Sequence, residues 1–164
     1  MNIKDNYGNT PLTISCEKGN LNIIKYLIRN GAEININNST HNSPLNIICK
    51  TRSENSLNIL KYLIRKGGNI NGKDENDITP LLMSCYFNNI ITLPYLVKNN
   101  ANVNIQNKYG DSPLIILCYF NNLTIINYLI KNNGNITLKN KYNDTFFTIA
   151  RRNKKIKKYL NFGN

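Results

Sequence analysis

The residues with the clearest chemical potential are four cysteines, because a thiolate can act as a nucleophile or as a metal ligand. The sequence Cys-Tyr-Phe-Asn-Asn occurs twice, beginning at Cys85 and at Cys118, so the same pentapeptide returns after 33 residues. Cys16 and Cys49 precede these two at similar spacing, and His41 is the single histidine of the chain. The cysteines either form a reactive or metal-binding site, or mark a repeated structural position.

A second candidate site is a near match to the phosphate-binding loop of nucleotide-binding proteins. Residues 67–74 fit the pattern G-x-x-x-x-G-K, but Asp74 stands where that loop needs a Ser or Thr hydroxyl for magnesium. The loop must also follow a strand and open directly into a helix, whose N-terminus receives the phosphate. The elements around residues 67–74 therefore decide this interpretation.

The elements that position these residues follow from an internal repeat. A Ser or Thr stands at positions 10, 43, 79, 112 and 145, at intervals of 33, 36, 33 and 33 residues, and Pro-Leu follows the first four. Two further landmarks keep the same order: a Tyr-Leu pair beginning at Tyr26, Tyr62, Tyr95 and Tyr128, and a turn beginning at Gly31, Gly67, Asn100 and Asn133. Three landmarks in fixed order, four times over, exclude coincidence.

On these landmarks, the chain closely resembles the ankyrin repeat family over its whole length. The family's T-P-L-H-x-A-A signature corresponds to residues 10–16, Thr-Pro-Leu-Thr-Ile-Ser-Cys, and the signature histidine is replaced in every copy. The resemblance implies an all-α solenoid, in which each 33-residue repeat is a β-turn hairpin followed by two antiparallel helices. We expect a single domain over residues 1–164, with repeats near 5–37, 38–73, 74–106 and 107–139 and a degenerate capping repeat over 140–164.

The residue types at each landmark agree with this fold. A Ser or Thr before Pro predicts an N-cap with Pro in the first helical position. The apolar residues recur at helical spacing and cannot all be buried within one helix pair, so neighbouring repeats must stack. Positions 31, 67, 100 and 133 are Gly or Asn, which favour the left-handed conformation at a helix end. Positions 8, 41, 77, 110 and 143 predict positive φ in the hairpins.

Three departures from the regular pattern lead to further expectations. Residues 51–56 include three extra residues between the helices of the second repeat, in a turn that tolerates insertion. Pro94 is expected to remove one hydrogen bond from the second helix of its repeat and to bend it. Residues 2–3 align with residues 35–36 and 104–105, the close of a repeat, so we expect the chain to belong to a longer array.

In this fold the four cysteines hold one equivalent position in the first helices, where the family usually has Ala. Equivalent positions in stacked helices lie roughly 8–10 Å apart, whereas a disulfide needs Cα atoms within about 7 Å. We therefore expect buried thiols with no catalytic or metal-binding role, no metal and no cofactor. Residues 67–74 would join a helix end to a hairpin, which is not the setting of a phosphate-binding loop. The sequence carries no other catalytic signature, so we do not expect an enzyme.

The resemblance implies a function in binding another protein, on the concave face that the hairpin tips and first helices form. By the family pattern, the candidate partner-binding residues are Tyr7, Asn9, Lys18, Lys50, Tyr86, Phe87, Tyr109, Asp111, Tyr119, Phe120 and Tyr142. Phe87 and Phe120 have an alternative interpretation as packing residues between repeats. The second-helix tyrosines are expected in the core: Tyr26, Tyr62, Tyr95 and Tyr128.

The charge distribution suggests a second function. The chain carries 21 basic and 9 acidic residues, with a formal net charge of +12. Six of the basic residues fall in one terminal cluster: Arg151, Arg152, Lys154, Lys155, Lys157 and Lys158. This cluster is either the polar outside of the capping repeat or a polyanion-binding site. Because no groove-reading module is present, nucleic acid is not the partner that we expect. A third hypothesis is a targeting segment of a larger multidomain protein.

The sequence also indicates where such a protein would work. No apolar run approaches the roughly 18 residues needed to span a bilayer. The first residues lack the apolar core of a signal peptide, and unpaired cysteines indicate a reducing compartment. We therefore expect a monomeric cytoplasmic or otherwise intracellular protein that does not insert into membranes.

Overall fold

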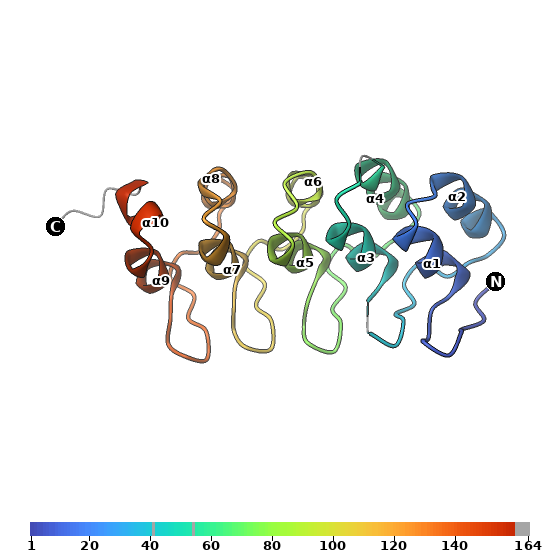
Figure 1. Ribbon diagram of the computed structural model, residues 1–164, viewed down its shortest axis with the longest axis horizontal. Helices are drawn as coiled ribbons and strands as arrows, with labels where there is room; N and C mark the ends of the chain where they lie inside the picture. The colour runs from blue at the N-terminus through green and yellow to red at the C-terminus, as the bar shows by residue number, and fades with distance from the viewer. Residues whose placement is uncertain (41, 54, 160–164) are drawn as a thin grey trace.

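The computed structural model describes residues 1–40, 42–53 and 55–159, which form short α-helices joined by turns and long hairpin loops (Figure 1). The helices are α1 Pro11–Glu17, α2 Leu21–Arg29, α3 Pro44–Lys50, α4 Ser56–Arg65, α5 Pro80–Tyr86, α6 Thr92–Lys98, α7 Pro113–Phe120, α8 Leu123–Lys131, α9 Phe146–Arg152 and α10 Lys154–Tyr159. None of these described helices is long and apolar enough to cross a bilayer. The expected turn residue His41, Glu54 of the insertion and the last five residues of the expected capping repeat lie outside the described residues.

Successive helices pack in pairs, and the pairs stack in one row. Each first helix contacts its own second helix, and α1, α3, α5, α7 and α9 contact one another in that order. Figure 1 shows the first helices along one edge of the row, with the hairpin loops projecting beyond them on the same side. This arrangement confirms the predicted all-α solenoid.

Each first helix begins as the sequence predicts. The side chains of Thr10, Ser43, Thr79, Ser112 and Thr145 accept a hydrogen bond from the backbone amide three residues on, and Pro follows the first four. Thr13 and Thr148, which stand in place of the signature histidine, form reciprocal capping boxes in α1 and α9. These bonds satisfy N–H groups that have no acceptor within the helix.

Each hairpin tip turns around one Asn or Asp side chain. The Oδ1 atoms of Asp5, Asn38, Asp74, Asn107 and Asn140 accept hydrogen bonds from the backbone amides two and four residues on, at 2.8–3.1 Å. The residue three positions after the Asn or Asp has positive φ, as predicted, at Gly8, Asp77, Gly110 and Asn143. The five Asn or Asp residues repeat at intervals of 33, 36, 33 and 33, and they form a fourth landmark besides the three used to predict the repeat.

A second set of Asn side chains joins each repeat to the next. The Oδ1 atoms of Asn2, Asn35, Asn71 and Asn104 accept hydrogen bonds from the backbone amides of residues 33, 69, 102 and 135, at 2.7–2.9 Å. The Nδ2 groups of the last three donate to the carbonyl oxygens of residues 67, 100 and 133. The predicted left-handed conformation is confirmed at Gly31, Gly67, Asn100 and Asn133, with φ of 66–95°.

The insertion in the second repeat folds around hydroxyl groups. Ser56, the first residue of α4, accepts a hydrogen bond from the Ser53 amide, and its Oγ lies 3.1 Å from Thr51 Oγ1. The Arg52 guanidinium reaches the third repeat, where it donates to the carbonyl oxygen of Phe87. The inserted segment therefore adds a contact between the second and third repeats.

Pro94 removes one backbone hydrogen bond from the second helix of its repeat, as predicted, and thereby shortens the helix. The first residue of α8, Leu123, corresponds to residue 90, but α6 begins only at Thr92. The Leu93 amide donates to the Asn89 carbonyl oxygen at 3.2 Å, so the next bond of this turn would run from residue 94 to Ile90, and proline has no N–H to make it. The helix is therefore shortened by the loss of this one hydrogen bond, and the expected bend stays a prediction.

The expected burial of the second-helix tyrosines holds only in part. Tyr62, Tyr95 and Tyr128 are half-buried against the core, whereas Tyr26 is 62% exposed, so its expected core position is wrong. This position faces the preceding repeat, because the Tyr128 hydroxyl donates to the Pro94 carbonyl oxygen at 3.3 Å. Within the described residues no helix pair precedes α1 and α2, which leaves Tyr26 in contact with solvent.

The last helix pair covers the apolar side of α7. Phe146 is 2% exposed, and Ala150 of α9 and Ile156 of α10 are fully buried. Asn153 joins the two helices, and its Nδ2 donates to the Cys118 carbonyl oxygen at 3.2 Å. Both helices are therefore held against the preceding repeat.

We predict that Asn107→Ala lowers the free energy of unfolding by about 1–3 kcal/mol, because two backbone amides of the tip lose the acceptor that the buried Asn107 side chain provides. Asn107→Asp should retain most of the stability, since Asp fills the equivalent positions 5 and 74. Urea denaturation of both variants measures the difference, with Asn6→Ala at an exposed tip position as the control. Equal losses in Asn107→Ala and Asn6→Ala would contradict this role.

Candidate functional site

The repeated pentapeptide marks the connection between the two helices of a repeat. Cys85 and Cys118 are fully buried in α5 and α7. The first Asn of each copy adopts positive φ, 46° and 54°, just beyond the end of the first helix. The second Asn accepts a hydrogen bond from a backbone amide at the start of the second helix. The Tyr and Phe between the Cys and the first Asn are the candidate binding residues of each copy.

The cysteines have the properties of core residues. All four are buried free thiols, which confirms their predicted place in the core. Burial raises the pKa of Cys16, Cys49 and Cys118 to about 12, and it raises the pKa of Cys85 as well. Almost no thiolate is therefore present at neutral pH. Over the ranges that the structure describes, no group of three or more His, Cys, Asp or Glu side chains could hold a metal ion.

Residues 67–74 form a repeat junction. Gly67 follows α4 with a φ of 95°, and Asp74 is the turn residue of the next hairpin tip. The Lys73 ammonium lies 3.0 Å from Asp77 Oδ1 in an ion pair, and α5 begins only at Pro80. Since no helix opens directly after Lys73, the segment lacks the row of amide N–H groups that holds a phosphate.

The hairpin tips and first helices form one face of the stack, called the concave face below, and this face contains two adjoining hollows. The first hollow is lined by Asn42, Lys50, Ile78, Met83, Tyr86 and Phe87. The second hollow adds Glu17, Thr40, Ile47 and Thr51 to Asn42, Lys50 and Phe87, which the two share. Apolar, amide and charged groups from three consecutive repeats therefore converge around Phe87.

Tyr86 and Phe87 are both half-buried, and both contact neighbouring repeats. The Tyr86 hydroxyl accepts a hydrogen bond from Asn107 Nδ2 at 2.6 Å. Burial raises the pKa of Tyr86, although the Asn107 hydrogen bond opposes this shift. The Lys50 ammonium lies 5.4 Å from the centre of the Phe87 ring, on the hollow side. Phe87 thus combines the two roles that the sequence leaves open, since it packs between repeats and lines the hollows.

Tyr119 and Phe120 occupy the same repeat positions but are 63% and 42% exposed. The tip residue Asn140, equivalent to Asn107, donates its Nδ2 to Asp111 Oδ1 at 2.9 Å and not to a tyrosine hydroxyl. Partial burial raises the pKa of Tyr119, and the carboxylates of Asp111 and Asp144 raise it further. Tyr109, on the preceding tip, is 47% exposed. The exposed aromatic surface is therefore larger in the fourth repeat than in the third.

The other predicted partner-binding residues divide into two groups. Tyr7 and Tyr142 are 76% and 74% exposed on the first and last tips, and Lys18 is exposed directly after α1. Asn9 and Asp111 instead join neighbouring tips, because their Oδ1 atoms accept hydrogen bonds from Asn38 and Asn140 at 2.9 Å each.

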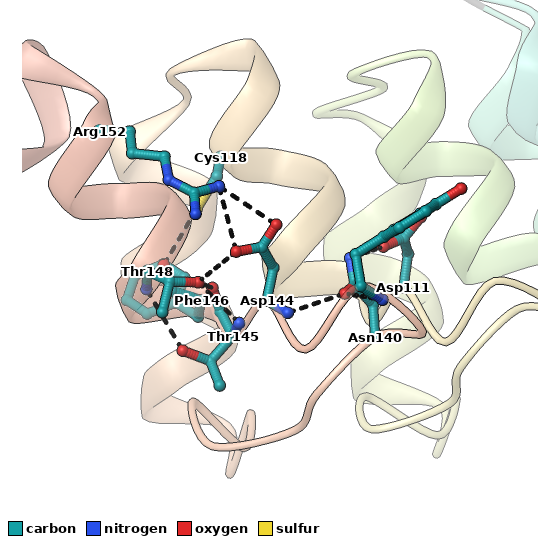
Figure 2. Close-up of polar contacts among 9 residues, drawn as sticks. Asp111, Cys118, Asn140, Asp144, Thr145, Phe146, Thr148 and Arg152 are labelled. Atoms are coloured by element: carbon teal, nitrogen blue, oxygen red, sulfur yellow. Dashed lines mark hydrogen bonds and ion pairs between the residues drawn. The ribbon is translucent and has the colours of Figure 1, made fainter.

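The predicted basic cluster lies on α9 and α10. Figure 2 shows Arg152 turned towards Asp144 of the last hairpin, and its Nη1 lies 3.1 Å from Asp144 Oδ1. The Thr148 hydroxyl donates to the same carboxylate at 2.9 Å, and this hydrogen bond fixes the orientation of the Asp144 side chain. The remaining basic residues are exposed, four of them around the buried Ile156: Arg151, Lys154, Lys155, Lys157 and Lys158.

Comparison with known proteins gives a match over most of the chain. The family model described as "Ankyrin repeats (3 copies)" matches residues 1–74 and 45–140. An ankyrin repeat protein of Rickettsia bellii (strain RML369-C) is 38% identical to this chain over 47 residues. These residues make up 29% of this chain and 28% of that relative, so the chain aligns with less than a third of the relative's length.

We predict that the buried thiols make stability fall at alkaline pH. The pKa of Cys49 and Cys118 is about 12 in the folded protein but about 8.5 when unfolded, so stability is complete below about pH 8.5 and declines as pH rises towards the folded value. Ionisation of each thiol in the unfolded state should lower the free energy of unfolding by on the order of 1 kcal/mol per pH unit in this window. Urea denaturation on either side of the unfolded pKa, compared with a Cys49→Ala/Cys118→Ala variant, measures this loss. Identical pH dependence in both proteins would contradict it.

Proposed function

Because this chain belongs to the ankyrin repeat family, whose members are generally protein–protein interaction modules, we propose that it is a noncatalytic scaffold that binds a partner protein on its concave face. The single observation that supports this proposal most strongly is the pair of hollows around Phe87, together with the exposed aromatic residues of the next repeat. The partner lies across the second, third and fourth repeats.

The chemistry of this face suits a protein surface. An aromatic ring buries on the order of 150–250 Å², and Tyr is a frequent source of binding energy in interfaces. Tyr119, Phe120 and Tyr109 offer exposed rings, while the hollows offer an apolar recess beside the Lys50 ammonium. A partner segment with an apolar anchor for the recess and aromatic or aliphatic contacts for the exposed rings would fit.

Rigid presentation is the mechanism that we infer. The side chains of the face belong to helices and to tips that are held by the Asn and Asp hydrogen bonds described above, so little conformational freedom is lost on binding. The half-buried Tyr86 is part of this frame, because its hydroxyl is bonded to the next tip. Tyr86 therefore serves mainly to position the face, and Tyr119 and Phe120 serve mainly to contact the partner.

A second candidate function is polyanion binding through α10. The observation in its favour is the set of four exposed lysines around Ile156: Lys154, Lys155, Lys157 and Lys158. A targeting segment within a larger protein is compatible with the same concave-face interaction. We also propose an intracellular protein, on the basis of the unpaired cysteines, and a monomeric one.

We predict that Tyr119→Ala/Phe120→Ala abolishes capture of the partner from lysate of cells that express the chain. Loss of two interface aromatics should weaken binding by at least about tenfold, equivalent to about 1.4 kcal/mol. Tyr26→Ala is a matched control, since Tyr26 is 62% exposed and Tyr119 is 63% exposed but on different faces. Both variants should melt like the wild type, because both sites are exposed. A protein retained equally by all three baits would contradict the concave-face assignment.

The concave-face proposal and the polyanion alternative predict different responses to the α10 lysines and to salt. If the partner binds the concave face, substitution of the four α10 lysines by Gln should leave partner capture unchanged. Capture should also persist when salt is raised, because the proposed contacts are largely apolar. Recovery of nucleic acid that falls steeply with salt and disappears in the Gln variant would instead favour the basic cluster.

A further inference from the structure

The α1/α2 pair carries four apolar residues that are in contact with solvent, and we call them the end face. Pro11 is exposed, and Ile14, Ile23 and Tyr26 are 39%, 47% and 62% exposed. The pair forms one end of the row in Figure 1. Isolated apolar residues on a surface are common, but four of them on one side of one helix pair require an explanation.

The same surface is buried in every internal repeat. The residues equivalent to Ile14 are 2–7% exposed, and those equivalent to Ile23 are 0–5% exposed: Ile47, Met83 and Ile116, and Ile59, Thr92 and Ile125. The preceding helix pair covers them, since α3 packs on α1, α5 on α3 and α7 on α5. The internal junctions therefore show what kind of structure covers this surface.

The end face also has the residue types of an internal junction. Its four residues are Pro, Ile, Ile and Tyr. The second repeat has the same residue types at the corresponding positions: Pro44, Ile47, Ile59 and Tyr62. The fourth repeat has the identical set in Pro113, Ile116, Ile125 and Tyr128, which the α5/α6 pair covers. A surface that only needed to face solvent would not require this set.

Asn2 supplies an independent polar observation. Its Oδ1 accepts a hydrogen bond from the Glu33 amide at 2.9 Å. Asn35, Asn71 and Asn104 make the same bond at the close of the preceding repeat in each internal junction. The polar half of a further junction is therefore already formed beside the end face.

We propose that the end face is a stacking interface for one further ankyrin-type helix pair, docked in the register of the internal junctions. The opposite end of a second copy is a poor match for this apolar surface, because its last described helix, α10, carries four exposed lysines. The proposed occupant has the character of the α5/α6 pair, which covers the identical residues in the fourth repeat. This interface is independent of the concave face.

The test adds such a pair to the full chain. A copy of residues 74–103 replaces Met1, so that Asn2 follows the copied Val103 as Asn104 does in the original. If the end face is a stacking interface, the melting temperature should rise by about 4 °C or more in a single transition. Hydrogen exchange of the α2 amides should slow by about tenfold or more.

The matched control is the same extension on an Ile23→Lys/Tyr26→Lys background, which should show neither the rise nor the slower exchange. The two substitutions alone should change the melting temperature of the original chain by less than about 2 °C, since both side chains are exposed. A separate, lower melting transition of the added pair, or an equal rise on the Lys background, would overturn the proposal. Light scattering adds a further outcome: a dimer of the original chain that these substitutions dissociate would also overturn it.

Discussion

The whole structure depends on the inability of one helix pair to bury its own apolar residues. The helices have only six to ten residues each, so one pair encloses too little volume for a core. The effect of stacking is visible at a single repeat position, where Ile14 is 39% exposed and Ile47, with α1 beside it, is 4% exposed. Each repeat therefore completes the core of the next, and the shape of the concave face is fixed by the junctions.

Stacking also brings backbone and side-chain polar groups out of water, and the abundant Asn residues satisfy them. Asn38, Asn107 and Asn140 are 5–7% exposed, and each holds two amides of a tip while reaching across to a neighbouring residue. Asn89 is 2% exposed and donates to carbonyl oxygens at the end of α3. An amide side chain suits these sites because it donates and accepts at once. Much of the Asn content of this chain is therefore a requirement of the fold.

The features that the sequence predicts correctly are those set by one residue and its immediate neighbours. The N-caps at Thr10 and Ser112 and the positive φ values at Gly67 and Asn133 are of this kind. The error concerns a contact between repeats. Tyr26 has the spacing of a core residue but lacks a covering helix, whereas the hydrogen bond that Pro94 removes is a local effect that the sequence predicts. The candidate site was predictable as a set of positions, but the exposure of each side chain was not.

The two copies of Cys-Tyr-Phe-Asn-Asn show why identical residues can differ in function. In the third repeat, Tyr86 is bonded to the next tip, and Phe87 is contacted by Lys50 and Arg52 from the repeat before it. The fourth repeat follows a repeat without the insertion that supplies Arg52, and its facing tip residue bonds to Asp111. Tyr119 and Phe120 are consequently left exposed. The neighbours of a repeat, together with its own tip residues such as Asp111, therefore decide which aromatic residues support the face and which are available to a partner.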